Sequence, residues 1–250
     1  MLLNNYIIAF FAGILPALVW LYFWRREDRR RPEPRRFILL AFISGMLAVP
    51  IALKFQLWVS AWLLENHAIE SVFPTAFITA LFAIFIWAAI EELLKFFMAS
   101  ISVLWRDVVD EPIDPMMYLI TTALGFSAAE NILFLLNPIM NGNPLGAIIT
   151  GNLRFVGASL VHIASSAIVG FFITLAFYKP KAVRRLYTAL GLILSFTLHT
   201  LFNFFIIQSQ IKSSSALIFT SFALIWTAAI IILIVFEKAK RIHPLKNPYK

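Results

Sequence analysis

Two adjacent glutamates and a lysine lie inside one of the most apolar stretches of the chain. Residues 88–97 read Ala-Ala-Ile-Glu-Glu-Leu-Leu-Lys-Phe-Phe, which places Glu91, Glu92 and Lys95 among hydrophobic side chains. A charge at the centre of a membrane-spanning helix costs about 3 kcal/mol on insertion scales, and such residues usually have a function. Glu91 and Lys95 are four residues apart, so they share a helix face and are expected to pair. A structural ion pair of this kind leaves Glu92, about 100° away on the helix, without an explanation.

Further polar residues lie in three other apolar stretches. They are Glu130 with Asn131, Arg154 with His162, and His199 with Asn203. A single histidine or asparagine in a helical bundle more often forms an interhelical hydrogen bond than a catalytic group. Arg154 lies near a predicted outer span end, from which its side chain can extend to the interface.

The depth of four of these residues in their spans argues for a shared site. Glu91 is 14 residues from Trp105, Glu130 is 15 from Pro115, His162 is 16 from Tyr178, and His199 is 14 from Arg185. At about 1.5 Å per residue, all four lie roughly 21–24 Å from the cytoplasmic end of their helices. Four helices are therefore expected to place two carboxylates and two imidazoles at one level, around a polar cavity.

Such a cavity has the residue types needed to hydrolyse a bond with an activated water. One glutamate acts as a general base on the water, a neighbouring acid or imidazole returns the proton, and histidine or asparagine donors stabilise the oxyanion. The chain has no cysteine, which excludes a thiolate nucleophile and cysteine-ligated zinc. Two histidines and a glutamate also resemble a zinc site, so a metal-dependent reaction is the alternative mechanism. Buried Glu, Lys and His residues also form proton relays, so a proton-coupled transporter is the alternative function.

The composition identifies the elements that must position these residues as membrane-spanning helices. The 250 residues are 61% hydrophobic and only 14% charged, whereas soluble domains contain about 25% charged residues. We therefore predict an all-α, polytopic transmembrane bundle that forms a single integral membrane domain, 1–250, with a catalytic core at 74–208. Seven apolar spans are expected, at 5–24, 37–64, 74–105, 116–136, 153–178, 186–208 and 216–236. Eight spans are the alternative, because the second span is long and contains Pro50.

The distribution of basic residues predicts the orientation of the bundle. Of the 21 Lys and Arg residues, 17 lie in the 25–36, 106–115 and 179–185 loops and in the C-terminal tail. Seven spans put all of these on one side, so the N-terminus is expected outside and the C-terminus in the cytoplasm. The net charge of +8 then reports membrane topology, and no nucleic-acid partner is expected. Asp114-Pro115 predicts a helix start, with Asp114 as the N-cap and proline in the first turn.

Three ordered motifs resemble those of the PrsW family of intramembrane proteases. Glu91-Glu92-Leu93-Leu94-Lys95 is similar to its EExxK motif, Phe126 to Glu130 to its FxxxE motif, and His199 to Asn203 to its HxxxN/D motif. Arg154 and His162 lie in the intervening helix, where the family carries an arginine and a histidine. The family is related to the CAAX-type and bacteriocin-processing membrane proteins, whose second motif has histidine where this chain has Glu130.

The resemblance implies a glutamate-dependent intramembrane endopeptidase in a prokaryotic plasma membrane. Its expected partners are the lipid bilayer and a membrane-anchored protein substrate, for which an anti-sigma factor is one candidate. The expected catalytic residues are Glu91, Glu92, Glu130, His162 and His199, supported by Lys95, Asn131, Arg154 and Asn203. No obligatory cofactor is expected, and the sequence does not separate the roles of Glu91 and Glu92.

Overall fold

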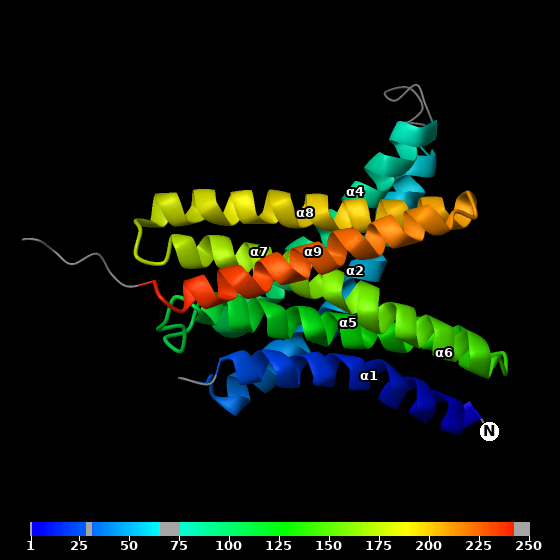
Figure 1. Ribbon diagram of the computed structural model, residues 1–250, viewed down its shortest axis with the longest axis horizontal. Coiled ribbons are helices and arrows are strands. Elements are labelled where there is room, and N and C mark those ends of the chain that lie inside the picture. Colours follow the sequence, from blue (N-terminus) through cyan, green and yellow to red (C-terminus); the bar gives the residue numbers. More distant parts are fainter. Residues whose placement is uncertain (1, 29–31, 66–75, 243–250) are drawn as a thin grey trace, which may run out of the picture.

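The computed structural model describes residues 2–28, 32–65 and 76–242, and these parts of the chain form a bundle of long helices (Figure 1). The elements are α1 (Leu2–Glu27), α2 (Arg35–Glu65), α4 (Ala76–Ala99), η1 (Ser100–Leu104), α5 (Asp114–Met140), α6 (Pro144–Leu153), η2 (Arg154–Ala158), α7 (Ser159–Leu175), α8 (Lys181–Ile211) and α9 (Ser215–Ala239). The segments η1 and η2 are single π-helical turns: η1 ends the helix that begins with α4, and η2 joins α6 to α7.

Among the described residues, six helices are long and apolar enough to cross a membrane. They correspond to the predicted spans except the third, which is α4, the helix that carries Glu91, Glu92 and Lys95. The predicted all-α membrane bundle is confirmed, although most of the helices extend a few residues beyond the predicted spans. The helix that bears His162 begins at Pro144, nine residues before the predicted start, because α6 continues through η2 into α7. Residues 74 and 75 of the predicted third span lie outside the described residues.

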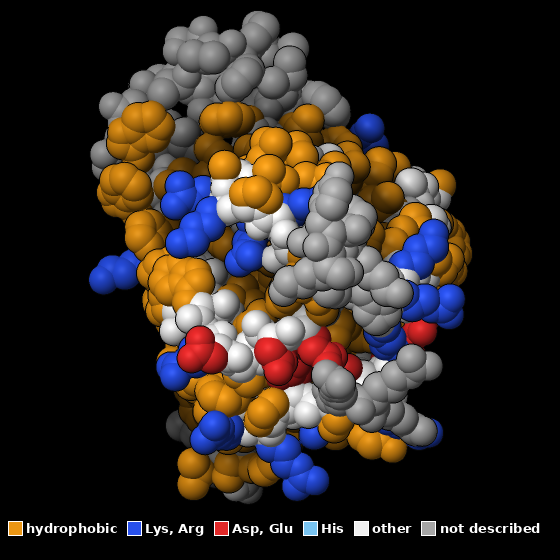
Figure 2. All heavy atoms as spheres, turned by 90° about the vertical axis from the view of Figure 1, so that its left-hand side faces the viewer, with side chains coloured by type: hydrophobic (Ala, Val, Ile, Leu, Met, Phe, Trp, Pro, Cys, Tyr) orange, Lys and Arg blue, Asp and Glu red, His pale blue; other side chains and the backbone are white. Residues whose placement is uncertain are grey.

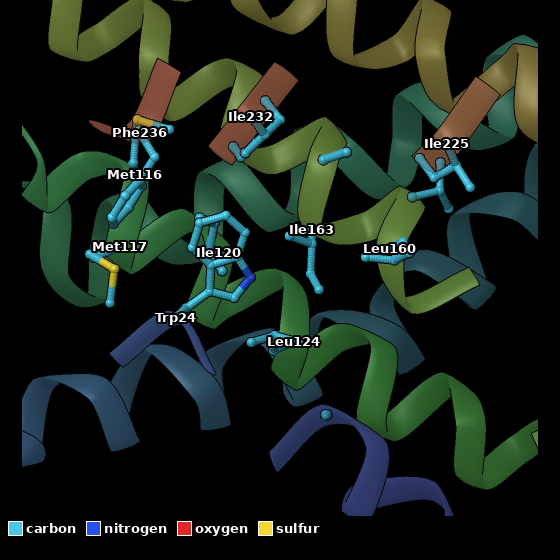
Figure 3. Packing of buried hydrophobic residues seen from close by; sticks show 14 of the residues in the cluster. Trp24, Met116, Met117, Ile120, Leu124, Leu160, Ile163, Ile225, Ile232 and Phe236 are labelled. Carbon is cyan, nitrogen blue, oxygen red and sulfur yellow. The ribbon is translucent and has the colours of Figure 1, made fainter. Parts of the chain in front are cut away.

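Helix α5 forms the centre of the bundle, packed against α1, α2 and α7. Its first half is buried on all sides, as expected of a helix surrounded by other helices. Figure 3 shows its side chains Met116, Ile120 and Leu124 meeting residues of α1, α7 and α9 in the main hydrophobic core. This core holds α5, α7 and α8, whereas smaller apolar clusters hold α4 against its neighbours.

Glycines allow α2 and α5 to approach each other closely. A Cβ atom added at Gly125 would lie 1.9 Å from the carbonyl oxygen of Phe42, and one added at Gly45 would lie 1.9 Å from that of Thr122. Only glycine fits at either position, so the two backbones touch at a reciprocal glycine contact. This contact fixes α2 beside the site; α2 continues through Pro50 as one helix.

The loops rich in Lys and Arg gather at one end of the bundle. The end of α1, the start of α2, the α4–α5 and α7–α8 connections and the end of α9 lie together at the left of Figure 1, opposite the N-terminus. Figure 2 views this end and shows basic side chains around a central group of acidic ones. By the positive-inside rule, this end faces the cytoplasm.

The acidic group at this end ties the α1–α2 connection to the start of α5. Asp114 is the first residue of α5 and not its N-cap, so the predicted capping role is wrong. Its carboxylate instead accepts hydrogen bonds from the backbone N–H groups of Asp110 (2.8 Å) and Glu111 (2.7 Å), which lie in the preceding loop. The Tyr118 hydroxyl donates to Glu33, whose side chain also bonds to that of Asp114. Burial, together with the nearby Asp114 carboxylate, raises the pKa of Glu33 to about 9 and that of Asp28 to about 7.

These raised pKa values predict that the protein loses stability as the pH rises. Between pH 4.5, the ordinary pKa of a glutamate, and about pH 9, Glu33 keeps its proton in the folded protein but loses it in the unfolded chain. Asp28 behaves in the same way between pH 3.8 and about pH 7. The folded state binds more protons in this range, so its stability is greatest below it and falls as the pH rises. We expect the melting temperature in detergent to fall by at least about 3 °C between pH 6 and pH 9. In Glu33→Gln most of the fall above pH 7 should disappear; an unchanged pH profile in this variant would contradict the prediction.

Candidate active site

Helices from distant parts of the sequence bring the predicted polar residues together. Helix α4 carries Glu91, Glu92 and Lys95, α5 carries Glu130 and Asn131, η2 and α7 carry Arg154 and His162, and α8 carries His199. All are largely buried; the side chains of Glu130 and Arg154 keep the greatest exposure, 20% and 12%, and therefore mark the side from which the site is open. Arg154 lies in the η2 turn, a kind of helix irregularity that is frequent at functional sites.

Lys95 pairs with Glu92 and not with Glu91, which corrects the pairing expected from the four-residue spacing. Its ammonium group donates to Glu92 Oε1, and both side chains are almost completely buried. It also lies 3.0 Å from Nδ1 of His162 and 5.0 Å from the centre of the Phe126 ring. Lys95 does not pair with Glu91, four residues away, because its charge is buried in the interior of the bundle, where Glu92 and His162 are its partners.

Glu92 is held by three groups from different helices. Besides Lys95, it receives His199 Nδ1 at 2.7 Å on Oε1 and the Ser166 hydroxyl at 3.4 Å on Oε2. Each of its oxygens therefore has a partner. Glu92 acts as a junction that joins α4, α7 and α8.

Glu130 forms the second junction, on α5. Its Oε2 lies 2.5 Å from Nη2 of Arg154 and 2.8 Å from Nε2 of His162. Arg154 Nε in turn donates to Oδ1 of Asn131 at 2.5 Å. Arg154 thus belongs to the buried network and does not extend to the membrane interface.

Glu91 is the carboxylate of the network that has one buried oxygen without a hydrogen-bond partner among the described residues. Its Oε1 accepts a hydrogen bond from Nε2 of Gln56 at 2.9 Å. Its Oε2 is buried and has no hydrogen-bond partner among the described residues. Nε2 of His199 lies 3.7 Å from this oxygen, which is too far for a direct hydrogen bond.

The hydrogen bonds define the proton positions on both imidazoles. A carboxylate only accepts, so the proton of His199 is on Nδ1, facing Glu92, and that of His162 is on Nε2, facing Glu130. Nδ1 of His162 then accepts from the Lys95 ammonium. In its neutral form, His199 presents the lone pair of Nε2 to Glu91 Oε2, 3.7 Å away. Two buried acceptors that face each other need a proton donor or a cation between them.

The network contains two residues that sequence reasoning did not identify, and leaves one predicted residue outside it. Gln56 on α2 and Ser166 on α7 each bond to one of the paired glutamates. Gln56 could have been found as an amide inside an apolar span; Ser166 carried no such signal. Asn203 lies one turn beyond His199 on α8, is half-buried, and forms no hydrogen bond with another described residue.

The open position also fits a metal ion in the type and spacing of its ligands. One ligand atom each from Glu91, His162 and His199 lie within 4.8 Å of one another. The 3.7 Å between Glu91 Oε2 and His199 Nε2 is short enough for both atoms to bind one zinc ion at about 2.0–2.2 Å. The third ligand, His162, already has a partner on each ring nitrogen, so it would have to give up one of these bonds.

Comparison with known proteins assigns this chain to one family. Residues 33–236 match the family described as PrsW family intramembrane metalloprotease, a range that contains every residue of the network. Three bacterial proteins named Protease PrsW are similar over most of their length. That of Geobacillus kaustophilus is 30% identical over 200 residues (80% of each chain), that of Oceanobacillus iheyensis 31% over 224 residues (88% of this chain, 91% of the relative), and that of Bacillus subtilis 27% over 197 residues (77% and 80%). No solved structure matches the chain.

Proposed function

Because this chain belongs to the PrsW family and is an intramembrane protease, we propose that Glu91 is the base that activates the hydrolytic water. The observation that carries the proposal is the open position between Glu91 Oε2 and His199 Nε2, two acceptors 3.7 Å apart. A water there donates one hydrogen to each and keeps its oxygen lone pairs free for attack. The other two carboxylates of the site, Glu92 and Glu130, are held by cationic partners.

In this mechanism, the water oxygen attacks the carbonyl carbon of a peptide bond of a membrane-anchored protein. Glu91 Oε2 takes the proton that the water loses as the new C–O bond forms. The tetrahedral intermediate then collapses, the C–N bond breaks, and the same proton passes from Glu91 to the leaving amine nitrogen. The site is buried in apolar surroundings, where a fixed base acts without competition from bulk water.

The remaining residues orient the base and the substrate. Lys95, Glu92 and His199 form a chain that points the His199 lone pair at the water. Asn203 lies one turn from His199, and its amide has no hydrogen-bond partner among the described residues; we assign it to the oxyanion of the intermediate. Arg154 and Glu130 lie on the exposed side of the network and hold His162 in place.

A metal-dependent form of the same reaction is the second candidate, because the ligand set of Glu91, His162 and His199 favours it. The family description also contains the word metalloprotease. These three residues would hold the ion, which would lower the pKa of a bound water and polarise the substrate carbonyl. Glu92 would orient His199 in this form as well, and Glu130 would still orient His162 if the ion takes Nδ1 of His162 in place of Lys95.

The function is tested by co-reconstituting the protein in liposomes with a panel of single-pass membrane proteins from bacteria. We expect cleavage of at least one of them, and no cleavage by the folded Glu91→Gln variant. Mass spectrometry of the products locates the cut. If Glu91→Gln cleaves at the wild-type rate, Glu91 is not the base.

Chelation separates the two forms of the mechanism. EDTA is added at a 10-fold excess over the total metal in the sample. If Glu91 acts directly on water, no step needs an ion, and the cleavage rate should stay within about twofold of the untreated rate. A loss of more than about 100-fold that is reversed by zinc would instead establish the metal-dependent form. Elemental analysis of the purified protein provides an independent check: less than one zinc per ten chains agrees with the first outcome, and one zinc per chain with the second.

A further inference from the structure

A groove of about 620 Å³ opens at the cytoplasmic end of the bundle, between the end of α4 with η1 and the first turns of α8. Its inner wall is formed by apolar side chains, among them Phe96, Leu104, Ile173, Phe177 and Leu192. Exposed Trp105 also lines the groove. Tryptophan is enriched where the bilayer core meets the headgroups, so we place the groove at this level on the cytoplasmic side.

Three basic side chains line the mouth of the same groove. Lys181, Arg184 and Arg185 belong to the first turns of α8 and are exposed. Among the residues that the structure describes, none of them is paired with a carboxylate. Nη2 of Arg184 donates to the carbonyl oxygen of Phe177 at 2.9 Å, which holds its guanidinium group over the groove wall. The hydroxyl of Thr188 lies one turn further along α8.

A buried polar group in the groove lining also lacks a partner among the described residues. Ser100, in η1, lines the groove and is 2% exposed, and its hydroxyl has no hydrogen-bond partner among the described residues. A buried hydroxyl without a partner is costly, so an acceptor from a bound molecule would stabilise it. The groove thus combines an apolar wall, an unsatisfied hydroxyl within it and unpaired cations at its mouth.

We infer that this groove binds an anionic phospholipid of the cytoplasmic leaflet, with the phosphate at Lys181, Arg184 and Arg185 and an acyl chain against the apolar wall. Charge complementarity selects the headgroup, since basic pockets between membrane helices on the cytoplasmic side suit anionic lipids. The apolar wall favours a lipid, because a free phosphate or a nucleotide would leave this wall uncovered. An ester carbonyl of the glycerol backbone would accept from Ser100. The inference does not depend on the peptidase chemistry.

The position of the groove connects it with the active site. Phe96 follows Lys95 directly in α4, and Leu192 lies two turns before His199 in α8. A lipid in the groove therefore packs against the two helices whose Glu92–His199 contact orients the site.

Native mass spectrometry of the full chain released from detergent tests this inference, with phosphatidylglycerol and phosphatidylcholine of identical acyl chains as probes. The wild type should retain one phosphatidylglycerol in preference to phosphatidylcholine. The triple variant Lys181→Gln, Arg184→Gln, Arg185→Gln should bind it roughly 100-fold more weakly, at about fivefold for each cation removed. The matched control is Arg25→Gln, Arg26→Gln, Lys238→Gln, which removes the same charge from the same end of the bundle but outside the groove.

A charge-neutral variant distinguishes a lipid from a free anion. Ala189 lines the groove, so Ala189→Trp should fill it and reduce phosphatidylglycerol binding at least tenfold while every cation is kept. Excess glycerol 3-phosphate should leave bound phosphatidylglycerol in place. Equal binding by the two triple variants, full binding by Ala189→Trp, or displacement by glycerol 3-phosphate would each overturn the inference. Melting curves of all variants confirm that loss of lipid is not loss of fold.

Discussion

Replacing Glu91 by glutamine is expected to lower the cleavage rate by about 1,000-fold without reducing stability. The loss follows from removing the general base, a contribution of about 10²–10⁴-fold in enzymes. The fold should be kept because the amide retains an oxygen for Gln56 and directs its NH₂ group at the Nε2 acceptor of His199. The change removes a buried carboxylate oxygen that has no partner among the described residues, so we expect an equal or higher melting temperature.

The matched control for this prediction is Glu92→Gln, the same substitution at the neighbouring residue. It removes the charge partner of Lys95 inside the bundle, where breaking a buried pair costs about 3–5 kcal/mol. Glu92→Gln should therefore lower the melting temperature by roughly 10 °C, in addition to reducing activity. Assays of cleavage and thermal stability on both variants separate the two roles. Equal destabilisation by both substitutions would refute the assignment of Glu91 as the open carboxylate.

Substituting Lys95 by methionine is expected to be the most destabilising single change at the site. The ammonium group is completely buried, and its loss leaves the Glu92 carboxylate with His199 and Ser166 as its partners among the described residues. The cost of an uncompensated buried charge is about 3–5 kcal/mol, so we expect the folded yield and the melting temperature to fall sharply. Lys54→Met, at an exposed position of α2, is the control and should change the folded yield and the melting temperature only slightly.

A double variant distinguishes loss of the ion pair from loss of packing. Lys95→Met combined with Glu92→Gln removes both charges, and replacing a buried pair by neutral side chains of similar volume is often close to neutral for stability. The melting temperature should return to within a few degrees of the wild type, whereas cleavage should stay low because His199 has lost the carboxylate that orients it. A double variant as unstable as Lys95→Met would show that Lys95 acts mainly through packing.

The sequence alone determined the class of fold and most of the residues of the site. Uninterrupted apolar stretches of about 20 residues have few alternatives to membrane-spanning helices, because only a helix satisfies its own backbone in lipid. Charged and polar residues within such stretches are costly and therefore conspicuous, so Glu91, Glu92, Lys95, Glu130, Arg154, His162 and His199 were identified without a structure. Counting residues along each helix placed Glu91, Glu130, His162 and His199 at one depth, and the contacts among these four side chains show that they meet.

The tertiary structure alone decided which of these residues contact one another. Helical spacing predicted Glu91 with Lys95, but contacts across helices joined Lys95 to Glu92 and His162 and left Glu91 open. Spacing along one helix carries no information about the rotation of the neighbouring helices, which apolar packing and the Gly45–Gly125 contact determine here. For the same reason Gln56, Ser166 and the lipid-sized groove beside η1 appear only in the folded chain. The sequence thus determines which polar residues lie within the membrane-spanning helices, whereas helix packing determines how the contacts of the two adjacent glutamates differ.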